Sequence, residues 1–238
     1  MIKVGHIGVF DTNIGDTAAT FNIERSWRAL HPDTEWFRLN LKSFWGHSNK
    51  PDIAKKALKE LQDKVDVIIV GGGGLLEYGG YDNMGTGWKL PFNEDILKTI
   101  EKPIHFHAVG LNIFRGGIPY SATAKAALQA CINLSTTFSV RNDGSYQKLR
   151  DWVGVDVSGV HIVPDPGLLH YDHLGIERKS SVNIGAVQPA WNGGEGINLN
   201  RYGSKANIKY IESFVADYKM IPHTSKDFRS KGAPILSS

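Results

Sequence analysis

The sequence has a single cysteine, Cys131, among 238 residues, so no disulfide bond can form within the chain. This composition fits a reducing compartment. Apolar residues surround Cys131 at helical spacing, which predicts a small buried side chain and not a nucleophile. No charged-then-apolar leader and no apolar run of bilayer-spanning length is present, so we expect a cytoplasmic protein without a transmembrane segment.

Blocks of like charge are also missing. The net charge is +3 with nine histidines counted as neutral, and lysine and arginine are spread along the chain. A nucleic-acid surface requires clustered basic residues, so we expect no nucleic-acid partner. Hydrophobic residues make up 41% and charged residues 21%, which is ordinary for a globular protein and enough for a core without a metal or disulfide.

Two nucleotide-binding signatures are absent. Neither Gly5-His6-Ile7-Gly8 nor the glycine run at 71–74 fits the G-x-G-x-x-G dinucleotide pattern, and no Walker lysine follows a glycine-rich loop. These absences argue against an NAD-dependent enzyme and a P-loop nucleotidase.

Apolar strand patterns alternate with amphipathic helix patterns through about residue 165. The alternation predicts an α/β fold, a Rossmann-like parallel sheet with helices on both faces. In such sheets ligands bind outside the carboxyl ends of the strands, so chemistry is expected in the strand-to-helix turns. The predicted strands are 2–10, 34–39, 65–70, 103–111, 137–141 and 161–163, and the predicted helices are 16–30, 53–61, 122–134 and 145–152.

Asp165-Pro166-Gly167 breaks the alternation. We predict an N-terminal Rossmann-like domain over 1–166, a linker over 167–181 and a partial second Rossmann-like lobe over 182–238. The second lobe is expected to be incomplete, because two strands and one helix cannot bury both faces of a sheet. Its exposed edge motivates the hypothesis of a homo-oligomer. The elements predicted there are strands 182–188 and 219–222 and a helix over 206–218.

The turn after the first predicted strand contains Asn13, Gly15 and Asp16. A helix N-terminus offers free backbone N–H groups and a partial positive charge. Gly15 allows close approach to a ligand, and Asn13 supplies donors and an acceptor. The alternative interpretation is a plain helix start, with Asp16 as the cap and Asn13 in a turn.

Four glycines, Gly71 to Gly74, follow the clearest strand of the chain. Glycine destabilises a helix by up to about 1 kcal/mol relative to alanine, so helix stability does not explain the run. Positive φ angles, or backbone contact between Gly72, Gly73 or Gly74 and an anionic ligand, would explain it. The alternative is a tight turn with close packing between helix and strand.

Arg141 ends another predicted strand and could pair bidentately with a phosphate or carboxylate. The alternative is a structural ion pair. Asp143 or Ser145 could cap the following helix. Asp165 ends the last strand of the first domain, where it could face the cleft or bond backbone groups at the domain junction. We expect the junction role.

Three histidines lie in or directly after predicted strands. His105 and His107 alternate along one strand and share a face, but no third ligand is evident, so we expect no metal site. His223 follows the strand predicted at 219–222, where it could act as an acid, a base or a phosphate donor.

An ordered set of strand-end motifs runs through residues 1 to about 227. It comprises Asn13-Ile14-Gly15-Asp16, Gly71-Gly72-Gly73-Gly74-Leu75-Leu76, Ala108-Val109-Gly110-Leu111-Asn112, Ser139-Val140-Arg141-Asn142-Asp143-Gly144-Ser145, Val163-Pro164-Asp165-Pro166, and Pro222-His223-Thr224 with Asp227. The set resembles the polysaccharide pyruvyl transferase family. Two departures are Asn142, where many members have an acid, and the lack of a later Arg-x-His segment, which suggests a C-terminally short member.

The resemblance implies a two-lobed, glycosyltransferase-B-like fold with the site in the cleft. It also implies transfer of a pyruvyl group from phosphoenolpyruvate to sugar hydroxyls, with phosphoenolpyruvate as donor substrate and no further cofactor. Arg141 would hold an anionic group, and His223 would act as acid or base or hold the leaving phosphate. Asp16 would orient or deprotonate an acceptor hydroxyl. The expected substrate-binding residues are Asn13, Gly15, Gly72, Gly73, Gly74, Arg141, Ser145 and Asp227.

Two other functions remain open at this point. One is a nucleotide-sugar glycosyltransferase of the same two-lobed architecture. The other is a truncated, non-catalytic relative that binds a glycan.

Overall fold

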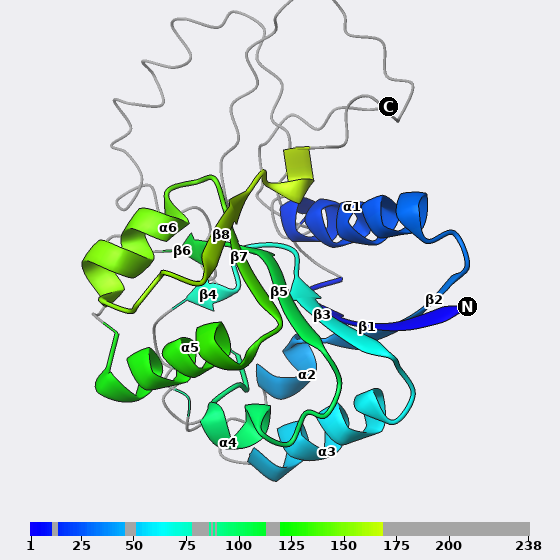
Figure 1. Cartoon of the computed structure of the whole chain (residues 1–238), viewed down its shortest axis with the longest axis horizontal. Helices are drawn as coiled ribbons and strands as arrows, with labels where there is room; N and C mark the ends of the chain where they lie inside the picture. The colour runs from blue at the N-terminus through cyan, green and yellow to red at the C-terminus, as the bar shows by residue number, and fades with distance from the viewer. Residues whose placement is uncertain are drawn as a thin grey trace, which may run out of the picture. The chain divides into compact units, whose positions relative to one another are not determined.

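The computed structural model describes residues 1–10, 14–45, 51–77, 86, 88, 90–112 and 120–168. These residues form a six-stranded, fully parallel sheet in the order β2-β1-β3-β5-β7-β8 (Figure 1). The α/β, Rossmann-like fold class is thereby confirmed. The strands are β1 (Ile2–Gly8), β2 (Thr34–Asn40), β3 (Val67–Gly71), β5 (Ile104–Val109), β7 (Thr137–Arg141) and β8 (Val160–Val163).

The helices lie close to where the sequence places them, with two additions. The helix predicted at 122–134 is confirmed at both ends, and Ser121 caps it by accepting a hydrogen bond from the Ala124 N–H. Helices α2 and α4 were not predicted, because each has only four residues and so shows no periodicity. The helices are α1 (Ile14–Leu30), α2 (Lys42–Trp45), α3 (Pro51–Gln62), α4 (Glu94–Leu97), α5 (Ala122–Leu134) and α6 (Ser145–Lys148).

Two further short helical segments differ from the sequence prediction. The predicted helix 145–152 is a single α turn followed by a π-helical stretch, Leu149–Val153. A 3-10 turn, Pro166–Leu168, follows β8 at the predicted domain junction. The linker from 169 onward and the whole predicted second lobe lie outside the described residues.

The main core lies between the sheet and helices α3, α4 and α5 (Figure 1). Ile7 of β1 points into it, whereas Val4 points to the opposite face and packs against Ile23 of α1. This alternation follows from the two-residue period of a strand. Cys131 of α5 is fully buried in the main core, as predicted, and burial raises the pKa of its thiol.

The face under α1 contains a buried ion cluster. The Glu24 carboxylate of α1 contacts His6 Nδ1 at 3.1 Å and accepts hydrogen bonds from Arg38 at 2.8 and 2.6 Å. Burial raises the pKa of Glu24, but hydrogen bonds and electrostatic attraction from Arg38 and His6 outweigh it and lower the pKa from 4.5 to about 2. The other ring nitrogen of His6 lies 3.3 Å from the Gly71 carbonyl oxygen at the end of β3.

Strands β3 and β5 both change direction at their carboxyl ends, where Gly73 and Gly110 lie side by side. Beyond the bend they continue as a short parallel pair, β4 (Leu76–Glu77) and β6 (Leu111–Asn112). The Gly110 N–H donates to the Gly73 carbonyl, and the Leu76 N–H donates to the Gly110 carbonyl, each at 3.0 Å. The single strand predicted at 103–111 is therefore two strands, β5 and β6, separated at Gly110. Within β5 a bulge shifts the register with β7 between Phe106 and Val109.

No helix within the described part of the chain is long and apolar enough to cross a membrane.

The ion cluster predicts a defined acid sensitivity. Because the folded state lowers the pKa of Glu24, the ionised carboxylate contributes about 3 kcal/mol of stability at neutral pH. This contribution is present above the unfolded pKa of about 4.5 and is lost as the pH falls toward 2. Glu24→Gln should lower the free energy of unfolding at pH 7 by about 3 kcal/mol and flatten its decline between pH 5 and 2.

Urea unfolding at several pH values measures both effects. Glu35→Gln is the matched control, since Glu35 lies exposed on β2 and its variant should track the wild type. A Glu24→Gln variant as stable as the wild type at pH 7 would contradict the assignment.

Candidate functional site

The start of α1 and the turn that follows β3 meet at the carboxyl edge of the sheet. The strand order changes direction between β1 and β3, and in doubly wound sheets the ligand crevice lies at this switch point. Asp16, in the first turn of α1, packs directly against Gly73, and a Cβ atom on Gly73 would overlap the Asp16 carboxylate. The structure thus brings Asp16, from the first predicted turn, against the glycine turn.

The glycine turn has conformations and contacts that only glycine permits. Gly72 and Gly73 have φ angles of 89° and 104°. A side chain on Gly72 would overlap Thr20 of α1, and one on Gly74 would overlap the Asn112 amide. Close packing between helix and strand therefore accounts for part of the glycine run.

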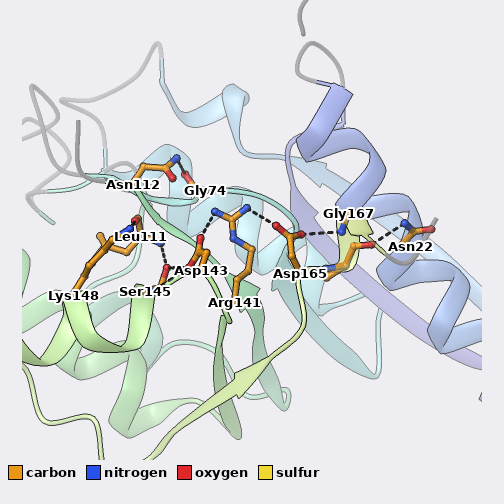
Figure 2. A network of polar contacts seen from close by, with 11 residues as sticks. Asn22, Gly74, Leu111, Asn112, Arg141, Asp143, Ser145, Lys148, Asp165 and Gly167 are labelled. Atoms are coloured by element: carbon orange, nitrogen blue, oxygen red, sulfur yellow. Dashed lines mark hydrogen bonds and ion pairs between the residues drawn. The ribbon is translucent and has the colours of Figure 1, made fainter. Parts of the chain in front are cut away.

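Arg141, at the end of β7, packs directly against Gly110. A Cβ atom at Gly110 would overlap the guanidinium group. The Arg141 side chain is 15% exposed, and its two terminal nitrogens bind carboxylates on different turns. Nη2 lies 2.8 Å from an oxygen of Asp143, and Nη1 lies 3.1 Å from an oxygen of Asp165 (Figure 2).

Asp143 is held inside its own turn. Its Oδ1 accepts hydrogen bonds from the Ser145 N–H at 3.1 Å and from the Ser145 hydroxyl at 2.5 Å. Burial raises the pKa of Asp143, but these hydrogen bonds and the Arg141 charge lower it more, so the net pKa lies below its ordinary value. Ser145 is fully buried, and its hydroxyl also accepts from the Leu111 N–H at 2.7 Å. The buried Ser145 therefore holds both the start of β6 and the Asp143 carboxylate in place.

Asp165 connects Arg141 to the segment after β8. Its Oδ1 accepts from the Gly167 N–H at 2.9 Å, so Asp165 bonds a backbone group, as predicted. The Pro166 carbonyl accepts from the side chain of Asn22, a buried residue of α1, at 2.8 Å. Figure 2 shows the resulting chain of contacts from Lys148 through Arg141 to Asn22.

Two carboxylates, Asp143 and Asp165, surround the guanidinium, and the charge of Lys148 also acts on Asp143. Arg141 Nε is buried and has no hydrogen-bond partner among the described residues. The strand-end turns therefore present an arginine whose charge is already compensated within the chain.

Comparison with known proteins decides the family. The family model described as polysaccharide pyruvyl transferase matches residues 13–230, which is most of the chain. The chain belongs to the polysaccharide pyruvyl transferase family. No curated protein sequence and no solved structure matches it.

The described part of this pyruvyl transferase family member places some predicted site residues together. Asp16 contacts the glycine turn, and Asn112 hydrogen-bonds the Gly74 carbonyl at 3.4 Å. Arg141 and Ser145 belong to the contact chain around Asp143 (Figure 2). Gly15 lies exposed in the first turn of α1. Three predicted site residues, Asn13, His223 and Asp227, lie outside the described residues.

The predicted site omitted four residues that the structure places at this edge. They contact Arg141 or the glycine turn and come from turns after β5, β7 and β8. Their position at strand ends was a usable signal, but their mutual contacts were not visible from the sequence. These residues are Gly110, Asn112, Asp143 and Asp165.

The histidines of β5 lie on the α1 face of the sheet. His105 Nδ1 is 2.9 Å from the Thr137 hydroxyl of β7, and partial burial lowers the pKa of His105. Among the described residues, no group of three or more His, Cys, Asp or Glu side chains is arranged to hold a metal ion.

The packing at Gly73 predicts a strong effect of a single methyl group. Gly73→Ala forces a side chain into the Asp16 carboxylate and places alanine at a φ of 104°. We expect the free energy of unfolding to fall by about 2–4 kcal/mol, from overpacking and backbone strain together.

Gly159→Ala is the matched control. Its Cβ would meet only Ile132 Cγ2, at an ordinary 3.8 Å. Chemical denaturation of both variants tests the prediction, and equal stability of the two would contradict it.

Proposed function

We propose that this chain transfers a pyruvyl group from phosphoenolpyruvate to hydroxyls of a sugar in a cell-surface or exopolysaccharide, forming a ketal. The observation that carries the proposal is the family match, which spans all the strand-end turns from the start of α1 onward. The geometry adds support, because a partly exposed arginine lies beside two such turns at the carboxyl edge of the sheet.

The chemistry requires binding of anions and movement of protons. Phosphoenolpyruvate carries a phosphate and a carboxylate, which cations and backbone N–H groups stabilise. Ketal formation adds a proton to the methylene carbon, joins two sugar oxygens to C2 and releases phosphate. The two hydroxyl protons balance the reaction, since one becomes part of the methyl group and one leaves with phosphate.

Each residue role is part of the proposal. Arg141 holds the donor carboxylate or phosphate, and the turn at Gly72–Gly74 faces the donor or the acceptor sugar. Asp16 orients an acceptor hydroxyl or accepts its proton. His223 acts as acid or base or holds the leaving phosphate, and Asn13, Gly15, Ser145 and Asp227 support the substrates. Ser145 does so through Asp143, since its hydroxyl is buried and already bonded.

One observation favours a second candidate, a non-catalytic relative that binds a glycan. Arg141 already forms two ion pairs within the chain, which is what a purely structural arginine would do. This candidate predicts no ketal product with any donor.

The associated setting is also proposed. A cytoplasmic location fits the single cysteine, and the partners are the donor and a glycan acceptor, without nucleic acid. Self-association and the two-lobed architecture remain predictions from the sequence.

Donor binding is the first test. Calorimetric titration of the purified chain with phosphoenolpyruvate should give saturable binding, and a nucleotide sugar should give none. Binding of the nucleotide sugar alone would instead indicate a glycosyltransferase. Binding of neither would favour the non-catalytic candidate.

Arg141→Ala should weaken phosphoenolpyruvate binding by about 10- to 100-fold, because a charge-assisted contact to the donor is lost. Arg150→Ala is the matched control, since Arg150 is exposed and, among the described residues, pairs with the adjacent Asp151. Circular dichroism checks that both variants fold. Unchanged donor binding in Arg141→Ala would remove Arg141 from the proposed site.

A further inference from the structure

Arg141 presents an electrostatic problem for any anionic ligand. Its guanidinium rests on Gly110 and is shared between Asp143 and Asp165. A ligand anion that approaches this arginine therefore meets two carboxylates beside one guanidinium, with Lys148 as the second cation of the same contact chain. It must either leave both carboxylates in place against their repulsion or displace one of them.

The two carboxylates are held unequally. Asp143 has three described contacts, two to Ser145 and one to Arg141 at 2.8 Å. Asp165 has two, one to the Gly167 N–H and a longer one to Arg141 at 3.1 Å. The contacts with Arg141 do not separate the two, since Asp165 accepts a hydrogen bond from Nη1 and Asp143 forms an ion pair with Nη2. Apart from Arg141, Asp143 accepts two hydrogen bonds from the buried Ser145, whereas Asp165 accepts one from the Gly167 N–H. Asp165 is the easier one to displace.

Displacement of Asp165 would not require its turn to unfold. The Pro166 carbonyl is held independently by the buried Asn22 side chain. The Gly167 N–H bonds Oδ1 of Asp165, whereas the contact with Arg141 uses Oδ2. A rotation of the carboxylate about its side-chain bonds can therefore release Arg141 Nη1 while the backbone of 165–167 stays in place.

We propose that Asp165 is the exchangeable counter-ion of Arg141 and that it determines which anions the site accepts. A phosphate or carboxylate group of the ligand takes the place of the Asp165 carboxylate at Nη1, while Asp143 stays bound at Nη2. Because the ligand must outcompete a carboxylate held close by, multiply charged anions are selected over singly charged ones. The identity of the anion as phosphoenolpyruvate rests on the proposed function, but the exchange itself does not.

The sign of one measurement separates exchange from a purely structural ion pair. In Asp165→Asn the competing charge is removed, while the amide oxygen can still accept from the Gly167 N–H. Exchange predicts that this variant binds phosphoenolpyruvate and inorganic phosphate about tenfold more tightly, the effect of removing a unit charge about 6 Å away at an effective dielectric constant of about 40. A purely structural ion pair instead predicts weaker binding of both anions, because the Arg141 side chain is no longer held in place by Asp165.

Calorimetric titrations of wild type, Asp165→Asn and Asp165→Ala with each anion at low salt measure the effect, and thermal unfolding checks folding. The Asp165→Ala variant should also bind more tightly. The matched control is Asp156→Asn, which removes an exposed carboxylate near the start of β8, at the other end of the strand from Asp165. It should leave both affinities unchanged.

Each outcome is decisive. If wild type binds phosphoenolpyruvate and the Asp165 variants bind it equally or less tightly, the exchange is wrong and the proposed function stands. If the variants bind phosphate more tightly but no form binds phosphoenolpyruvate, the exchange stands and the pyruvyl donor assignment fails. If no form binds either anion, the exchange is overturned and Arg141 is a structural residue.

Discussion

The bend that β3 and β5 share is the constraint on which the carboxyl edge depends. Two backbone hydrogen bonds between the Gly73 region and Gly110 join the strands beyond the bend, so neither can straighten alone. The bend on β3 brings Gly73 against Asp16, and the bend on β5 turns Gly110 toward Arg141. Residues from three strand ends thus meet because two neighbouring strands leave the sheet plane together.

The bend requires an unusual backbone. Ala108 is fully buried and has a φ of 53°, a conformation that costs roughly 1–2 kcal/mol for a residue with a side chain. Ser139 of β7 compensates for the bulge, because its hydroxyl accepts from the Ala108 N–H and donates to the Phe106 carbonyl. Strained positions of this kind persist where the surrounding structure fixes them, and they concentrate at functional sites.

Local patterns in the sequence were sufficient to predict the strands of the sheet but not the bend that β3 and β5 share. The apolar runs predicted each of the six main strands, and helix α5 was predicted at both ends, because burial imposes periods of 2 and 3.6 residues. Nothing in the residues around Ala108 indicates a positive φ angle, since alanine is a good former of regular structure. The partners of Arg141 were equally hidden: Asp165 lies 24 residues away, and only the parallel pairing of β7 with β8 brings it close.

The two interpretations of Arg141, as an anion-binding residue and as a structural ion pair, describe the same atoms in different states. A largely buried arginine without a counter-ion would be costly, so a chain that needs an arginine at this edge must supply carboxylates to hold it when no ligand is present. Those carboxylates then compete with the ligand. The arginine needs a counter-ion when no ligand is bound, and it must be free to bind the ligand when one arrives. Two unequal partners meet both requirements. Asp143 keeps the guanidinium against Gly110, and Asp165 neutralises it until a more strongly charged anion replaces it.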